Sequence, residues 1–174
     1  MYSRIPRRHK HGVHPCTMPA RHRFEASLRW TGAQGGATTA YDAYDRSLLV
    51  EVDGKPPLDL SAAPPLRGDG GRHNPEDLLV AALSACHALS YLALCARRGV
   101  RVVAYEDAAV GELGHGAPGK TLHFHEVVLR PRVTIDATSD LALAEQLHAR
   151  AHDECFIAAS VSFPVRVEAV VVRP

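Results

Sequence analysis

Apolar and polar residues alternate near the start of the chain and later merge into one long apolar run. Between residues 24 and 30 every second residue is apolar, which is typical of a half-buried strand. A second strand is predicted at 47–52, because an Asp53-Gly54 turn follows it. Further strands are predicted at about 100–113, 121–135 and 161–172. The pattern therefore predicts several short strands that pair as hairpins.

The apolar run is predicted to be a long helix over residues 75–98. Asn74 is a good N-cap, and Pro75 fits the first helical position. Two acidic residues follow Pro75 and two arginines precede Gly99, so the charges complement the helix dipole. Gly99 supplies the left-handed residue that ends the helix.

A second helix is predicted at about 139–153, and it begins at Ser139 or Asp140. Hairpin strands with few helices indicate the α+β class and not alternating α/β units. With 46% hydrophobic residues, the 174-residue chain can build one core. We expect 1–22 to be a disordered basic tail and 23–174 to be the folded domain.

Charge and composition limit the kinds of partner that the protein is expected to bind. The formal net charge of +1 does not favour nucleic acid or anionic lipid. Residues 78–96 carry no formal charge and are long enough for a membrane span, but Ser84 and His87 interrupt the run. A helix that is apolar on nearly all faces can equally be the centre of a soluble fold. No apolar signal-peptide region follows the basic N-terminus. We expect a cytoplasmic protein with neither a membrane nor a nucleic acid as partner.

The four cysteines suggest free or catalytic thiols. Cys95 follows Cys86 by nine residues, which turns it to the opposite helix face about 13 Å away. A disulfide needs Cα atoms within about 7 Å, so Cys95 is predicted to be a core residue. Cys16 lies in the tail, which leaves Cys155 as the structured partner of Cys86. Two such thiols suit redox chemistry in which one is oxidised to a sulfenic acid and the other resolves it.

Two polar residues on the predicted helix, Glu76 and His87, could influence Cys86. Glu76, ten residues earlier in the first helical turn, either complements the helix dipole or holds an arginine near the thiol. Such an arginine would favour the thiolate. His87 is adjacent in sequence but points about 100° away, so we expect a structural role.

A metal site is the alternative that the histidines raise. His148 and His152 lie four residues apart on a predicted helix, and Cys155 is three residues further on. His123 and His125 share one face of a strand and could add to such a site. The spacing fixes no further acidic or thiol ligand, so we predict no metal and no cofactor. The sequence also lacks a hydrolase nucleophile elbow and a phosphate-binding loop.

Two segments resemble the OsmC/Ohr family of thiol-dependent organic hydroperoxide reductases. They are residues 74–87, which begin Asn-Pro-Glu-Asp-Leu-Leu and end Ser-Ala-Cys-His, and residues 151–158, Ala-His-Asp-Glu-Cys-Phe-Ile-Ala. The resemblance implies antiparallel sheets wrapped around a long central helix in an intertwined homodimer. It also implies active sites at the dimer interface.

The resemblance further implies roles for individual residues. Cys86 would be the peroxidatic cysteine, Cys155 the resolving one, and Glu76 the residue that positions an arginine. Family members carry that arginine at different points of the chain. Arg46 is the first candidate here, and Arg67, in the loop before the Asn-Pro-Glu motif, is the second.

The implied reaction reduces an organic hydroperoxide to an alcohol through a Cys86 sulfenic acid and a Cys86–Cys155 disulfide. A dithiol, either a lipoyl protein or a thioredoxin-type reductant, would then restore both thiols. The competing hypothesis is a non-enzymatic OsmC-like protein that binds a hydrophobic ligand or a metal.

Overall fold

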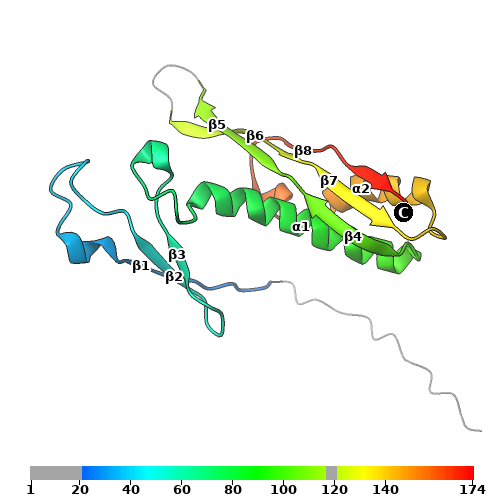
Figure 1. Ribbon diagram of the computed structural model, residues 1–174, viewed down its shortest axis with the longest axis horizontal. Coiled ribbons are helices and arrows are strands. Elements are labelled where there is room, and N and C mark those ends of the chain that lie inside the picture. Colours follow the sequence, from blue (N-terminus) through cyan, green and yellow to red (C-terminus); the bar gives the residue numbers. More distant parts are fainter. Residues whose placement is uncertain (1–20, 117–120) are drawn as a thin grey trace, which may run out of the picture.

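The computed structural model describes residues 21–116 and 121–174 (Figure 1). The tail predicted at 1–22, with Cys16, thus falls almost wholly outside the described residues. The elements are β1 (Ser27–Trp30), β2 (Leu48–Glu51), β3 (Leu58–Leu60), α1 (Pro75–Arg98), β4 (Val102–Asp107), β5 (Val110–His115), β6 (Leu122–Leu129), β7 (Pro131–Ile135), α2 (Leu141–Asp153), β8 (Val165–Val167) and β9 (Val170–Val172), with short 3-10 turns at Gly32–Gly35, Pro64–Leu66 and Ala158–Ser160. The class is α+β, as predicted.

Helix α1 has the boundaries that the sequence predicts. The Asn74 side chain accepts a hydrogen bond of 2.8 Å from the backbone N–H of Asp77. At the other end Gly99 adopts φ 77°, and its N–H donates to the carbonyl of Cys95. These caps satisfy backbone groups that a helix leaves unpaired at its ends.

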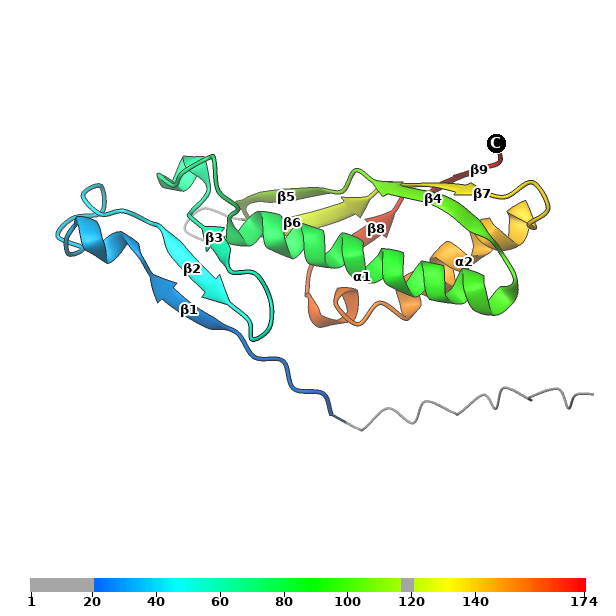
Figure 2. The same cartoon turned by 60° about the horizontal axis from the view of Figure 1, so that its bottom comes forward.

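The strands form three separate three-stranded sheets, in the orders β1-β2-β3, β4-β7-β9 and β5-β6-β8. The first sheet lies beyond the N-terminal end of α1, while the other two lie along α1 together with α2 (Figure 2). The main core between α1, α2, β4, β7 and β9 contains Tyr91, Leu94, Cys95, Val133, Ile135 and Leu147. A smaller core under β6 contains Leu83, Val127 and Leu129.

The expectation of purely antiparallel sheets is wrong for two strand pairs. β8 pairs in parallel with β6, and β9 pairs in parallel with β7. A parallel pair needs a long crossover, and α2 provides it between β7 and β8. The remaining pairs, β1–β2, β2–β3, β4–β7 and β5–β6, are antiparallel.

Two predicted strands are each divided in the structure. The segment predicted at 100–113 forms β4 and β5, and the segment at 121–135 forms β6 and β7. Arg130 separates β6 from β7, and its backbone N–H donates to the Asp107 carboxylate at the end of β4. The two arms of this long hairpin therefore pass from one sheet to the next at opposite positions. The short strand β3 was not predicted.

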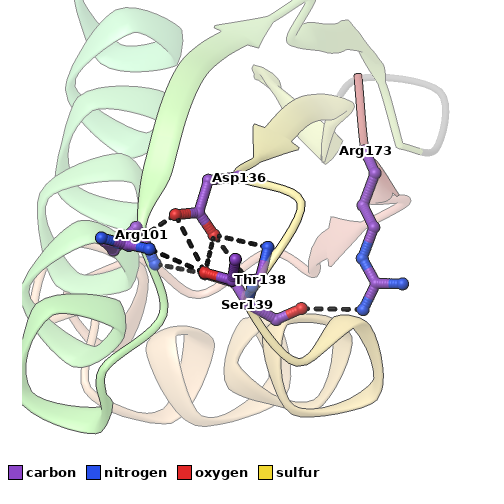
Figure 3. Close-up of polar contacts among 5 residues, drawn as sticks. All are labelled: Arg101, Asp136, Thr138, Ser139 and Arg173. Carbon is purple, nitrogen blue, oxygen red and sulfur yellow. Dashed lines mark hydrogen bonds and ion pairs between the residues drawn. The ribbon is translucent and has the colours of Figure 1, made fainter.

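The end of α1 is tied to the start of α2 by one carboxylate (Figure 3). Asp136 forms an ion pair with Arg101 and accepts hydrogen bonds from the backbone N–H and the hydroxyl of Ser139. These contacts lower the pKa of Asp136, with the Ser139 hydroxyl as the largest cause. Arg173, beyond β9, donates to the Ser139 carbonyl. The network fixes the position of α2, whose far end leads into Cys155.

Helix α1 is buried on one side only. Leu83, His87 and Tyr91 are fully buried, whereas Leu89 is 70% exposed and Leu92 is 38% exposed. By length and composition α1 could also cross a membrane, a test that core helices of soluble proteins pass as well. Within the described chain it packs against α2 and β4.

Candidate functional site

Cys86 and Cys155 are brought together by the two helices. Cys86 lies at mid-length on α1, on the buried side. Cys155 follows the last turn of α2, where its backbone N–H donates to the His152 carbonyl at 3.1 Å. The two thiols lie close enough to interact, since Cys86 contributes to the raised pKa of Cys155, and both cysteines are free. The structure therefore brings together the two cysteines that the sequence pairs.

Burial makes Cys155 a weak acid. Its side chain is only 1% exposed, and this burial raises the pKa of Cys155 to about 11. Backbone N–H groups of Ala158 and Ile157 oppose the shift, whereas the neighbouring Cys86 thiol adds to it. Cys155 is consequently a neutral thiol at neutral pH, and a neutral thiol is a poor nucleophile.

Cys95 occupies the position predicted for it. It is 1% exposed in the main core, and burial raises the pKa of its thiol. The neighbouring Tyr91 hydroxyl donates to the Ala144 carbonyl at 3.2 Å. Cys95 is thus a packing residue.

Glu76 lies in the first turn of α1 with one carboxylate oxygen buried. Its Oε2 atom has no hydrogen-bond partner among the described residues. Glu76 lines a cavity of about 730 Å³ together with Ser84, Asp107 and Phe124, and the described residues that line this cavity include neither cysteine. A buried carboxylate oxygen without a partner is costly, so this oxygen is available to a cationic group.

Arg46 is held by tyrosines in the segment before β2. Its guanidinium donates to the carbonyls of Tyr41 and Tyr44 and lies 4.9 Å and 4.1 Å from the centroids of their rings. It lines a second cavity, of about 480 Å³, that also reaches Pro75, the neighbour of Glu76. The Arg67 guanidinium lies 5.9 Å from the Tyr41 ring centroid. Both candidate arginines therefore gather around Tyr41.

The loop that carries Arg67 is tightly closed. Arg67 has φ 65°, in the left-handed region that a side chain rarely adopts. The following Gly68 lies so close to the Ala62 carbonyl that a Cβ would overlap it. The loop is joined at its base by the Ser61 N–H, which donates to the His73 carbonyl at 2.9 Å. Arg67 is consequently presented from a rigid turn.

Sequence reasoning missed two sets of contacts. Tyr41 and Tyr44 both precede Arg46 in sequence, and their aromatic rings were the available signal for the ring contacts. The second set pairs Ser84 with Asp107, whose carboxylate accepts the Ser84 hydroxyl at 2.5 Å. Its partners are 23 residues apart, and no pattern in the sequence connects them.

Two of the histidines near the cysteines, His87 and His148, form a buried pair. His87 is fully buried, and its Nε2 lies 3.1 Å from Nδ1 of His148, which confirms a structural role for His87. The His148 ring stacks on Tyr91 with centroids 3.8 Å apart. Within residues 21–116 and 121–174, no three or more His, Cys, Asp or Glu side chains are arranged to hold a metal ion. The set of His148, His152 and Cys155 is therefore not assembled.

The protein therefore has an α+β fold in which two of its cysteines, Cys86 and Cys155, lie next to each other. Residues 68–170 match the family model described as OsmC-like protein. The chain belongs to the OsmC-like family.

Solved structures agree with this assignment. An OsmC-like protein of unknown function from Vibrio cholerae is 35% identical, with a TM-score of 0.78 over 86% of this chain and 100% of that one. An organic hydroperoxide resistance protein from Elizabethkingia anophelis is 19% identical, with a TM-score of 0.64 over 90% of this chain and 100% of that one. One from Bacillus subtilis is 17% identical, with a TM-score of 0.57 over 86% and 98%. No curated protein matches the sequence.

Proposed function

We propose that the protein is a thiol-dependent peroxidase that reduces organic hydroperoxides to alcohols. The Cys86 thiolate attacks one peroxide oxygen, the O–O bond breaks, and the leaving alkoxide takes a proton to become the alcohol. Cys86 is left as a sulfenic acid. The Cys155 sulfur then loses its proton as it attacks the Cys86 sulfur, the S–OH bond breaks, and the hydroxide leaves as water to give the disulfide.

The proximity of the Cys86 and Cys155 thiols is the observation that carries this proposal. It supports a resolving step between these two cysteines. The raised pKa of Cys155 supports the division of roles, because a protonated thiol does not compete for the peroxide. Structural likeness to hydroperoxide resistance proteins adds support at the level of the fold.

Glu76 and an arginine complete the proposed site. We assign the arginine to Arg46, with Arg67 as the second candidate. The unpartnered oxygen of Glu76 suits a guanidinium, and Arg46 already lines the cavity that reaches Pro75. A guanidinium at the thiol would stabilise the thiolate and donate hydrogen bonds to the peroxide.

A homodimer is part of the proposal. The exposed side of α1 carries large apolar residues, including Leu89 at 70% exposure. A contiguous apolar face on a central helix favours burial against a second copy.

The residues around the thiols favour one class of substrate, and the disulfide requires a reductant. Leu83 and Ile157 pack in the core near Cys86 and Cys155, which favours an alkyl chain over hydrogen peroxide. The disulfide must be reduced by exchange with an external dithiol, either a lipoyl protein or a thioredoxin-type protein.

Mass spectrometry after one equivalent of cumene hydroperoxide tests the proposal. The wild type should form the Cys86–Cys155 disulfide within seconds, together with one equivalent of alcohol. Cys86→Ser should form neither product. Cys155→Ser should release one equivalent of alcohol and stop at the sulfenic acid, which dimedone traps. Cys95→Ser is the matched control and should behave as the wild type. An unmodified Cys86 with no alcohol released would refute the peroxidase.

The second candidate function is binding of a hydrophobic ligand without catalysis. The cavity of about 480 Å³ favours it, because Trp30, Tyr41, Leu48 and Leu66 give it a mainly apolar lining. Under this hypothesis the thiols would stay reduced after peroxide addition. Quenching of Trp30 fluorescence by a fatty acid would be the positive result.

A further inference from the structure

The outer face of the β5–β6 hairpin carries two exposed histidines, His123 and His125. Their ring centroids are 4.7 Å apart, with the ring planes at 61°. Alternate residues of a regular strand lie about 6.6 Å apart, so the two rings lean together. Phe124, between them, packs into the core on the other face.

An irregularity in the sheet accounts for this approach. Glu112 pairs with Glu126, but the next residue of β5, Leu113, pairs with Phe124. His125 is therefore the extra residue of a β-bulge. Bulges bend a strand and redirect a side chain, and they are frequent at functional sites.

Two glycines on β5 leave the space that the imidazole rings occupy. A Cβ at Gly114 would lie 2.9 Å from Nε2 of His125, and a Cβ at Gly116 would lie 2.7 Å from Cε1 of His123. Any larger residue at either position would push a ring away. Both rings therefore lie on one face of the hairpin, against the backbone of Gly114 and Gly116.

A backbone contact sets the tautomer of His123. Its Nδ1 lies 3.2 Å from the Thr121 carbonyl, which can only accept a hydrogen bond. The proton is therefore on Nδ1, and Nε2 presents its lone pair. The same arrangement orients histidines that bind metals, because the second ring nitrogen is fixed by an outer hydrogen bond.

The ring separation matches that of two imidazoles on one ion. With a metal–nitrogen bond of about 2.05 Å, each ring centroid lies about 3.2 Å from the metal, so the centroids are about 4.5 Å apart at a 90° angle and about 5.2 Å at the tetrahedral angle. The observed 4.7 Å falls between these values.

We infer that His123 and His125 form a surface chelate for a divalent transition-metal ion such as Cu²⁺ or Zn²⁺. Imidazole nitrogen suits these ions and not Mg²⁺ or Ca²⁺. The pair supplies two ligands, and water completes the coordination. The site is separate from the cysteines and does not depend on the peroxidase proposal.

The test is a Cu²⁺ titration of the full-length protein followed in ¹H–¹⁵N spectra. Substoichiometric Cu²⁺ should broaden the amide signals around His123 and His125. His9, His11 and His14 remain in every variant, and ions that they bind broaden other signals. His123→Gln and His125→Gln should each weaken binding at the hairpin at least about tenfold, because the chelate is lost.

Two further variants separate a chelate from a general effect of imidazole. His115→Gln is the matched control: strand alternation places it on the opposite face from Gly114, so hairpin broadening should persist. Gly114→Val keeps both histidines but displaces the His125 ring, and binding should weaken. Unchanged hairpin broadening in His125→Gln would overturn the inference, as would equal loss in His115→Gln.

Discussion

Acid should destabilise the protein through the buried histidine pair. The pKa of His148 is lowered from 6.5 to about 4, first by burial and second by the charge of His87. The pKa of His87 is lowered for the same main reason, with His152 adding to the shift and Asp107 opposing it. The unfolded chain therefore binds a proton at a pH where the folded chain does not.

The sign and size follow from proton linkage. A base whose folded pKa is depressed has its full stability above the unfolded pKa of about 6.5, and loses it as the pH falls toward 4. One such group costs about 2 kcal/mol of unfolding free energy between pH 7.5 and pH 5. We count the proton of His148 alone, because His87, whose pKa is also lowered, adds to the loss in the wild type and in a His148 variant alike.

Urea unfolding at pH 7.5 and pH 5.0 measures this loss. The informative quantity is the change in unfolding free energy between the two pH values, since carboxylates contribute equally to all variants. His148→Gln should lose about 2 kcal/mol less than the wild type between these pH values, whatever its own stability. His73→Gln, at an exposed position, is the control and should match the wild type. The same pH dependence in His148→Gln and the wild type would refute the reasoning.

Four other perturbations test the fold and the site. Leu83→Ala should lower the unfolding free energy by about 3 kcal/mol, because Leu83 is fully buried; a loss under about 1 kcal/mol in urea unfolding would contradict this. Leu89→Glu should convert a dimer to a monomer in analytical ultracentrifugation, and a wild-type monomer at micromolar concentration would remove the dimer. Arg46→Met should slow Cys86 alkylation at neutral pH severalfold, and if Arg67→Met does so instead, Arg67 takes the role. A chain that starts at Met18 should keep its melting temperature and turnover, and a loss of several degrees would show that the tail packs on the body.

The sequence was most informative where local rules act alone. Asn74 and Gly99 mark the ends of α1 because a cap and a left-handed residue act over a few neighbouring positions. Helix geometry also separated Cys95 from Cys86 and left Cys155 as the partner. The structure brings those two thiols together, while their chemical roles stay a proposal.

The sequence did not predict which strands pair with each other when they are far apart in the chain. The three-residue strand β3 is stabilised by its register with β2, where Leu48 faces Leu60, and its own residues give too short a pattern. The parallel pairs of β8 and β9 depend on where α2 returns the chain. Arg46 shows the same limit: its partners are the carbonyls of Tyr41 and Tyr44, which no residue-type pattern predicts.

The contact between Cys86 and Cys155 has a consequence for the unfolded chain. The two positions are 155 − 86 = 69 residues apart, and the segment between them includes β4 to β7 and α2. A disulfide there would restrict the denatured ensemble and raise the unfolding free energy by about 4 kcal/mol on chain-entropy grounds. The sheet β1-β2-β3 lies outside this covalent loop and would gain none of that protection. Oxidised protein would therefore resist proteases along its central segment while its N-terminal sheet stays as susceptible as in the reduced form.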